Sequence, residues 1–300
     1  MANTISYASK YAPELDKMIT QEAKTGFMAD NAFKAKFVGA KSVYLPDITL
    51  EGLGDYNRNG GEGGNMGYSK GDVGLEYKKY ELTMERSKQL ILDAQDADES
   101  GVADLAGKLV GEFTRTKVIP EIDAYALSTL AGYAKTANHT KTYTASNAVK
   151  DLLDGINYVE SANGYSNEQI VAMVDPVLYS AIMTSAELQR MIIASDFKQG
   201  EVNLKVKSLN GVSIIPVSSE RMHTVIETTA TGFIPGEGDK TLHAVIMPKG
   251  AASLIKKVDK VNMFTPEQVE DMDAYKINFR LYYDLFVKNS KVNTIYTITG

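Results

Sequence analysis

The sequence contains no cysteine in its 300 residues. Disulfides, thiolate catalysis and metal centres held by cysteine are therefore excluded. No apolar run approaches the roughly 20 residues that a membrane helix needs. Residues 1–20 lack both the basic start and the apolar core of a signal peptide. We therefore expect a soluble chain made in a cytoplasm, with nothing removed by secretion.

The sequence also lacks a block of positive charge. Its formal net charge is −6, and short basic pairs such as Lys78-Lys79 and Lys256-Lys257 lie among acidic neighbours. A sequence-independent nucleic-acid binder usually displays a basic face, so strong DNA binding is not expected. The hydrophobic content of 44% is sufficient for a real core in one large domain or two ordinary ones.

Catalytic motifs are scarce. The three histidines, His139, His223 and His243, form no H-E-x-x-H or H-x-H pair, and G-x-S-x-G is absent. Two S-x-x-K matches, at residues 195–198 and 253–256, lack the companion motifs of a serine enzyme. The sequence therefore predicts no enzyme activity, no cofactor and no metal site.

Residues 52–74 hold nine of the 24 glycines. They match neither the P-loop nor the dinucleotide pattern, and a strand-like run follows them where both patterns need a helix. The acidic stretch that starts at Asp96 resembles a calcium loop, but its twelfth position is Gly107 where a bidentate Glu is required. The arrangement of Asp96 and Glu99 is typical of a helix N-cap.

Hydrophobic periodicity predicts a mixed α+β chain. Residues 7–24 have the spacing of a short amphipathic helix, and residues 96–135 that of a long helix, which Pro120 must kink or restart. Strand-like runs at 43–48 and 74–93 enclose the glycine-rich stretch, which predicts an extended hairpin arm.

The remaining elements follow from local signals. We expect a helix at 146–162, a buried strand at 170–174, and a helix after the Asp175-Pro176 start signal. Asn210-Gly211 predicts a hairpin. A strand at 243–247 and two final strands joined near residues 289–290 complete the chain.

The order of these parts resembles the major capsid proteins of tailed bacteriophages. The resemblance rests on three groups of segments and covers nearly the whole chain: FVGAKSVYLPDITLEGLGDYNRNGGEGG with LTMERSKQLILDAQDADES, then FTRTKVIPEIDAYALSTLAG, and finally LNGVSIIPV, MPKGA and DAYKINFRLYYDLFV. It implies the fold shared by tailed-phage and herpesvirus shells. The corresponding parts are an N-terminal arm (1–42), an extended loop (43–93), a peripheral domain with a spine helix (94–145, the helix within about 96–135), an axial domain (146–260) and return strands of the peripheral domain (261–300).

The resemblance implies a structural protein that self-assembles into the icosahedral head around phage double-stranded DNA, within the host cytoplasm. Its partners would be copies of itself in pentamers and hexamers, a portal, possibly a decoration protein, and weakly contacted DNA. Some relatives begin with a cleavable scaffolding segment, whereas this fold starts near Met1, so a separate scaffolding protein is expected.

The physics of the arm also favours contact with a neighbouring copy. A hairpin of about 50 residues cannot bury itself on its own body, and an exposed strand edge needs a partner. The glycines would let its tip bend between different local angles. The predicted contact residues of the tip are Tyr56, Arg58, Gly60, Gly61, Glu62, Gly63, Gly64, Tyr68 and Lys70.

The spine helix supplies a second set of candidates, namely Phe113, Arg115, Pro120, Glu121, Asp123 and Tyr125. Glu121 and Asp123 are two residues apart, so they point to different faces and do not form an acid–base pair. We expect them on a solvated or subunit-facing helix surface. Covalent cross-links occur in some relatives, with Lys70, Lys78 and Lys79 as conceivable donors here, but no partner asparagine can be assigned.

Two other functions stay open. An encapsulin-type bacterial compartment shell has the same fold but encloses cargo enzymes, and only the contents of purified particles would distinguish it. A surface adhesin with a mixed α+β core belongs to a different class, and the lack of a signal peptide argues against it.

Overall fold

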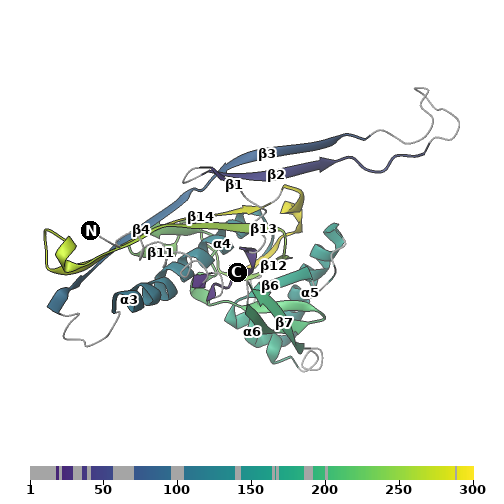
Figure 1. The fold of residues 1–300 in the computed structure, drawn as a ribbon. Helices are drawn as coiled ribbons and strands as arrows, with labels where there is room; N and C mark the ends of the chain where they lie inside the picture. Colours follow the sequence, from purple (N-terminus) through teal and green to yellow (C-terminus); the bar gives the residue numbers. More distant parts are fainter. Residues whose placement is uncertain are drawn as a thin grey trace. The chain divides into compact units, whose positions relative to one another are not determined.

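The computed structural model describes residues 18–19, 22–29, 36–38, 42–56, 71–95, 105–138, 143–163, 166, 169–185, 192–199, 202–287 and 289–300 (Figure 1). The chain divides into two compact units. One comprises Phe33–Thr83, and the other comprises Met1–Ala32 with Met84–Gly300. Each unit is described below by itself.

The smaller unit is an antiparallel sheet in the order β1-β2-β3. Its strands are β1 (Lys36–Val38), β2 (Ser42–Leu50) and β3 (Val73–Glu81). The β2–β3 register runs from Ser42 opposite Glu81 to Leu50 opposite Val73. Figure 1 shows β2 and β3 side by side as a long two-stranded ribbon. The predicted extended hairpin is therefore present.

The structure moves the end of this hairpin. The sequence predicts one strand over residues 74–93 and an arm that ends at Asp93, whereas the chain forms two strands, β3 and β4 (Met84–Asp93), in different sheets. The unit boundary accordingly lies at Thr83. Alternation in this run is imperfect because its two halves pair with different neighbours.

The larger unit contains a three-stranded antiparallel sheet in the order β13-β14-β4. The strands β13 (Ala252–Phe264) and β14 (Ala274–Val287) pair along almost their whole lengths. The register of β14 with β4 runs from Ala274 opposite Asp93 to Tyr283 opposite Met84. Buried residues of β14, including Ile277, Phe279 and Leu281, form one core with the long helix.

That helix spans 29 residues in three segments: α3 (Leu105–Phe113), the π-helical turn η2 (Thr114–Val118) and α4 (Ile119–Tyr133). We call residues 105–133 the spine helix. The N–H of Ile119 donates to the carbonyl of Thr114, which is the i−5 spacing of a π turn. Pro120 is the second residue of α4, where a missing N–H costs least. The predicted restart at Pro120 thus takes the form of a wider turn just before it.

A seven-stranded mixed sheet forms the rest of the body, in the order β5-β15-β12-β6-β9-β8-β7. The pairs β15–β5 and β6–β9 are parallel, and the other pairs are antiparallel. The strands are β5 (Lys135–Asn138), β6 (Ile170–Val174), β7 (Ile192–Gln199), β8 (Val202–Leu209), β9 (Val212–Pro216), β12 (Leu242–Pro248) and β15 (Tyr296–Thr299).

Strand β6 shows how this sheet separates two cores. Every residue of β6 is buried. Val171 and Met173 belong to the core shared with the spine helix, whereas Ile170, Ala172 and Val174 belong to a second core under α5 (Ala145–Asn163) and α6 (Pro176–Met183). Because successive residues point to opposite faces, a strand covered on both faces is apolar throughout.

Several local predictions are confirmed. The Asp175 side chain accepts a hydrogen bond from the N–H of Leu178 at 2.8 Å and caps α6. Asn210 and Gly211, with φ of 52° and 89°, make the turn between β8 and β9. The helix predicted at 146–162 is α5. The helix predicted at 7–24 lies mostly outside the described residues, of which 18, 19 and 22 are helical.

The last strand is placed differently from the prediction. The sequence assigns residues 261–300 to one set of return strands, but of this range only β14 and the end of β13 belong to the three-stranded sheet, and β13 begins at Ala252, inside the range predicted as axial domain. After η6 (Asn289–Thr294), β15 pairs with β12 and β5 in the seven-stranded sheet. Its buried residues Thr297, Ile298 and Thr299 fit between two neighbouring strands.

A small β-hairpin, β10 (Ile226–Thr229) with β11 (Gly232–Pro235), lies in the segment between β9 and β12. Three short 3-10 turns complete the described elements: η1 (Gly26–Met28), η4 (Ser219–Arg221) and η5 (Pro266–Gln268). In the described part of the chain, no helix is both long and apolar enough to cross a membrane.

Candidate functional site: the spine helix and the hairpin

Two aromatic pairs fix the spine helix over β14. The ring of Phe113 meets that of Phe279 edge to face, with centroids 5.7 Å apart, and the ring of Tyr125 meets that of Tyr283 in the same way at 5.3 Å. The Tyr125 hydroxyl also donates to Asp284 Oδ1 at 2.8 Å. Each such pair adds about 1 kcal/mol beyond area burial, so the helix is held in one rotational setting.

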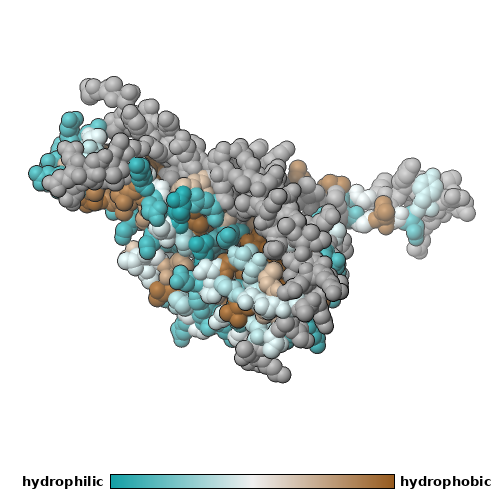
Figure 2. Space-filling model, turned by 90° about the horizontal axis from the view of Figure 1, so that it is seen from below, coloured by the Kyte–Doolittle hydropathy of each residue, from teal (hydrophilic) through white to brown (hydrophobic). Residues whose placement is uncertain are grey.

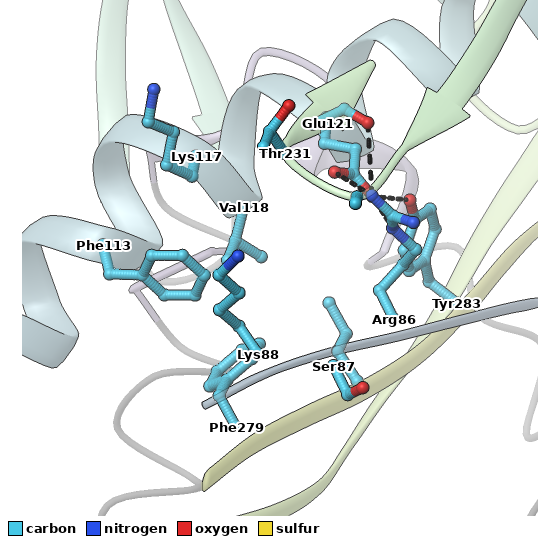
Figure 3. A pocket seen from close by; sticks show the side chains of 13 residues that line it. Arg86, Ser87, Lys88, Phe113, Lys117, Val118, Glu121, Thr231, Phe279 and Tyr283 are labelled. Atoms are coloured by element: carbon cyan, nitrogen blue, oxygen red, sulfur yellow. Dashed lines mark hydrogen bonds and ion pairs between the residues drawn. The ribbon is translucent and has the colours of Figure 1, made fainter. Parts of the chain in front are cut away.

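Glu121 ties the helix to β4 through Arg86 (Figure 3). The Arg86 guanidinium donates to both carboxylate oxygens, from Nε to Oε1 at 2.6 Å and from Nη2 to Oε2 at 3.2 Å. The Tyr283 hydroxyl donates to the same carboxylate at 3.0 Å. The hydrogen bond that Arg86 donates to Glu121 raises the pKa of Arg86. Burial, reinforced by the Glu121 charge, raises the pKa of Tyr283, so its hydroxyl remains a donor.

Arg86 also binds the turn between β10 and β11. Its Nη2 donates to the carbonyl of Thr229 at 2.6 Å and to that of Gly232 at 3.2 Å. One guanidinium therefore connects β4, the spine helix and this turn. A second contact, from the Ser128 hydroxyl to the carbonyl of Thr224 at 3.0 Å, attaches the same segment to the helix further along.

Asp123 is fully buried and has four hydrogen-bond donors around it. The N–H groups of Lys24 and Thr25 donate to it at 3.0 Å each, and the Thr25 hydroxyl donates at 2.6 Å. Arg221 Nη1 donates to Oδ2 at 2.8 Å and neutralises the carboxylate. Asp123 therefore anchors the N-terminal segment and η4 to the same side of the helix.

The expectation that Glu121 and Asp123 lie on a solvated or subunit-facing surface is wrong. Their side chains do point to different sides, as the spacing requires, but each meets an arginine inside the subunit, Arg86 and Arg221 respectively. The side chains of Glu121 and Asp123 are only 12% and 0% exposed. Isolated buried carboxylates would be costly, and the arginines offset that cost.

The sequence alone does not identify these arginines as the partners of Glu121 and Asp123. A usable signal was present, because Asp123 lies between the apolar residues Ile122 and Ala124 in a mostly apolar helical segment. Such a residue needs a buried cation or several donors. The identity of the cation could not be read from the sequence, because Arg221 is 98 residues away.

Arg115 is the exposed member of the predicted set. Its Nε donates to Glu22 Oε2 at 2.9 Å and its Nη2 donates to Glu22 Oε1 at 3.0 Å. Its Nη1 also lies 3.5 Å from Glu112 Oε2. The hydrogen bond from Arg115 lowers the pKa of Glu22. This pair joins the N-terminal segment to the helix at the surface, beyond the buried contact at Asp123.

The hairpin unit exposes apolar residues. The exposed fractions of Val73, Leu75 and Tyr77 are 68%, 60% and 49%, and those of Leu53 and Tyr56 are 108% and 59%. Val73, Leu75 and Tyr77 share one face of β3. Figure 2 shows apolar atoms, in brown, at the surface of this thin hairpin. Of the predicted tip residues, the structure describes only Tyr56; Arg58, Gly60, Gly61, Glu62, Gly63, Gly64, Tyr68 and Lys70 lie outside the described residues.

The structure describes some of the lysines considered for cross-linking and two of the three histidines. Lys79 pairs with Glu81 at 2.9 Å, and Lys70 is outside the described residues. Nδ1 of His223 lies 2.6 Å from Asp239 and Nδ1 of His243 lies 3.0 Å from Asp175. Among the described residues, no three His, Asp or Glu side chains gather as a metal site would require. His139 lies outside them.

A pocket of about 330 Å³ lies between β4, the spine helix and the β10–β11 turn. Strand β4 contributes Arg86, Ser87 and Lys88. The other residues around it are Phe113, Lys117, Val118, Glu121, Ala230, Thr231, Gly232, Phe279, Leu281 and Tyr283. Figure 3 shows Lys88 reaching from β4 toward the helix beside Phe113, and Lys117 extending from the helix. The pocket thus combines an apolar floor with cationic side chains.

No protein-family model and no curated protein matches the sequence. Solved structures do match, at low identity. The capsid structure of the cyanophage P-SCSP1u is 12% identical, with a TM-score of 0.61, over 88% of this chain and 84% of that chain. A structure from Mycobacterium phage Che8 is 14% identical, with a TM-score of 0.55, over 89% and 92%.

A virus-like particle from Pyrococcus furiosus covers 98% of this chain and 99% of its own, at 10% identity and a TM-score of 0.52. The solved structures that match are mostly tailed-phage capsids. The chain therefore has the α+β fold of tailed-phage capsid proteins, and the predicted fold class is confirmed.

Proposed function

We propose that this chain is the major capsid protein of a tailed bacteriophage, and that its copies self-assemble into the icosahedral head that encloses double-stranded DNA. The observation that carries the proposal is the shared fold over 84–92% of two phage structures and 88–89% of this chain. In this proposal the protein is structural and not an enzyme, it is located in the virion, and it assembles in the host cytoplasm.

The division of the chain follows the fold. The unit Phe33–Thr83 would be the extended loop, the three-stranded sheet with the spine helix the peripheral domain, and the seven-stranded sheet with α5 and α6 the axial domain. The buried contacts of Glu121 and Asp123 would give the peripheral domain a rigid frame. Pentamers and hexamers would then differ mainly in the hairpin.

The hairpin supplies the proposed contact between copies. Leu53, Tyr56 and Leu75 are more than half exposed, and burying such side chains stabilises an interface. The tip, residues 56–70, would contact another copy through Tyr56, Arg58, Gly60, Gly61, Glu62, Gly63, Gly64, Tyr68 and Lys70. A separate scaffolding protein, a portal and possibly a decoration protein would complete the head, which contacts its DNA weakly.

Negative-stain microscopy of the expressed protein tests the assembly proposal. We expect closed polyhedral shells, alone or with the products of neighbouring genes. A protein that remains a stable monomer of about 33 kDa, with or without those products, would contradict the proposal.

The tip is tested by two matched variants. Deletion of residues 60–64 should impair shell assembly more than folding of the subunit. Replacement of the four glycines Gly60, Gly61, Gly63 and Gly64 by alanine keeps the length but removes backbone freedom. Normal shells from both variants would contradict the proposed role of the tip in contacts between copies.

A compartment shell is the second candidate, since the Pyrococcus virus-like particle covers nearly the whole chain. The contents of purified particles separate the two functions. Packaged DNA supports a phage head, whereas packaged protein without DNA supports an enzyme-storing compartment.

A further inference from the structure

Strand β4 has a strand partner on one side only in the described part of the chain, namely β14. The pocket beside it is lined by three successive β4 residues, Arg86, Ser87 and Lys88. Successive side chains of a strand point to opposite faces, so a pocket that meets three in a row lies against the edge of the strand. Every second residue of an edge strand directs its N–H and C=O outward.

The groove beside this edge is apolar at its floor. Phe113 and Phe279 meet there edge to face, and Leu281 lies next to them. Arg86 at one end is neutralised by Glu121 and also saturated by two carbonyls. The groove has a volume of about 330 Å³, which suits one or two side chains of a peptide rather than a whole helix.

The remaining charge in the groove is positive. Lys88 and Lys117 both line it, and both side chains are exposed. Neither lysine forms an ion pair with a described residue. The chain as a whole carries a net charge of −6, so two lysines beside an apolar floor are a local exception that favours an acidic partner.

We propose that this groove binds an extended, acidic peptide segment of a different protein, which adds a strand to the outer edge of β4. An aromatic or branched aliphatic side chain of the peptide would lie on the Phe113–Phe279 floor, and carboxylates on either side of it would face Lys88 and Lys117. Main-chain hydrogen bonds give affinity in this mode, and the pocket gives selectivity. The site is complete within one copy, so it goes beyond self-assembly and does not require it.

Fluorescence anisotropy on the full-length protein tests this with a labelled, end-blocked probe peptide, Glu-Val-Phe-Val-Glu. We expect saturable binding that weakens as salt is added. Replacing the peptide's glutamates by lysines should abolish binding. Methylating the backbone nitrogens that face the strand should weaken it about tenfold, the equivalent of one or two lost hydrogen bonds.

Charge reversals locate the site on the protein. Lys88→Glu and Lys117→Glu should each weaken binding about threefold, as expected for exposed ion pairs. The matched control is Lys108→Glu, an exposed lysine of α3 that does not line the groove, and it should bind the probe like the unchanged protein. Thermal unfolding of each variant shows whether a loss of binding reflects loss of the fold.

Three outcomes would overturn the proposal. If the probe does not bind, the groove is not a peptide site, and Lys88 would only keep the exposed edge of β4 from pairing with other strands. Equal binding of the methylated peptide would exclude strand addition. Tighter binding of the peptide Glu-Gly-Leu-Gly-Asp-Tyr, which is residues 51–56 of this chain, would make the groove a contact between copies. Because every residue that lines the groove belongs to one copy, probe binding measured on the subunit fraction isolated by size exclusion is independent of whether shells form.

Discussion

Strands β3 and β14 use their apolar residues in opposite ways. In β14, Tyr282 and Tyr283 are each 1% exposed, whereas in β3, Val73 and Leu75 are 68% and 60% exposed. Burial from water is what makes apolar residues stabilise a fold. The residues of β14 therefore stabilise the single subunit, whereas those of β3 can contribute only when something else covers them. Apolar residues thus stabilise the fold of the subunit in β14 and, in our proposal, stabilise the contact between copies in β3.

The largest effect should come from the core of the spine helix. Leu127 is 0% exposed, and Leu127→Ala should lower the free energy of unfolding by about 3 kcal/mol because it leaves a cavity. Urea unfolding followed by circular dichroism measures this. If Leu127→Ala lowered the free energy of unfolding no more than the substitution of an exposed leucine does, the contrast between the buried core and the exposed strand β3 would not hold.

The next effect concerns the buried carboxylate. Asp123→Ala removes the acceptor of four hydrogen bonds and leaves Arg221 without its counter-ion. We expect a loss of about 2 kcal/mol in unfolding free energy. Faster hydrogen exchange at the amides of Lys24 and Thr25 should accompany it. Unchanged exchange there would show that Asp123 does not anchor the N-terminal segment.

A smaller effect should appear in acid at the small β-hairpin. Burial alone would raise the pKa of Asp239, but hydrogen bonds from the Val225 N–H and from His223 lower it below 3.8. The stabilisation is thus present above the unfolded value and is lost as the pH falls through the folded pKa. Asp239→Asn should therefore destabilise the protein more at about pH 6 than at about pH 3, because the charge contribution shrinks as the pH falls. A constant difference across both values would exclude the charge as the cause.

The smallest effect on folding should come from β3. Leu75→Ala should change the unfolding free energy by no more than about 0.5 kcal/mol, because the side chain is already solvated in the subunit. It should nevertheless reduce the yield of shells in microscopy and sedimentation. Leu127→Ala is the matched comparison, and a large folding defect in Leu75→Ala would erase the distinction between the regions.

Local signals predicted much of the fold. The Asp175 cap, the Asn210-Gly211 turn and the periodicity of α4 and α5 depend on residues close in sequence, and the structure confirms each of them. The full order of elements was needed to predict the capsid fold, because no single motif is specific to it. The shared fold of the solved structures bears that prediction out.

Long-range pairing could not be predicted. Arg86 and Glu121 are 35 residues apart, and their contact depends on the register of β4 against β14. The break between β3 and β4 and the return of β15 to the larger sheet also depend on which strand is nearest in space. The predicted contacts of the hairpin tip involve other copies, so a single chain does not test them.

The π turn η2 has a consequence for how the spine helix can change. A π turn amounts to one extra residue inserted into a regular helix, and one residue corresponds to a rotation of roughly 100°. The wider turn absorbs that rotation, so deleting one residue from Thr114–Val118 would make the helix regular and keep Glu121 and Asp123 facing Arg86 and Arg221. This segment therefore lets the spine helix hold one extra residue without changing the phase of the α-helical turns on either side of it.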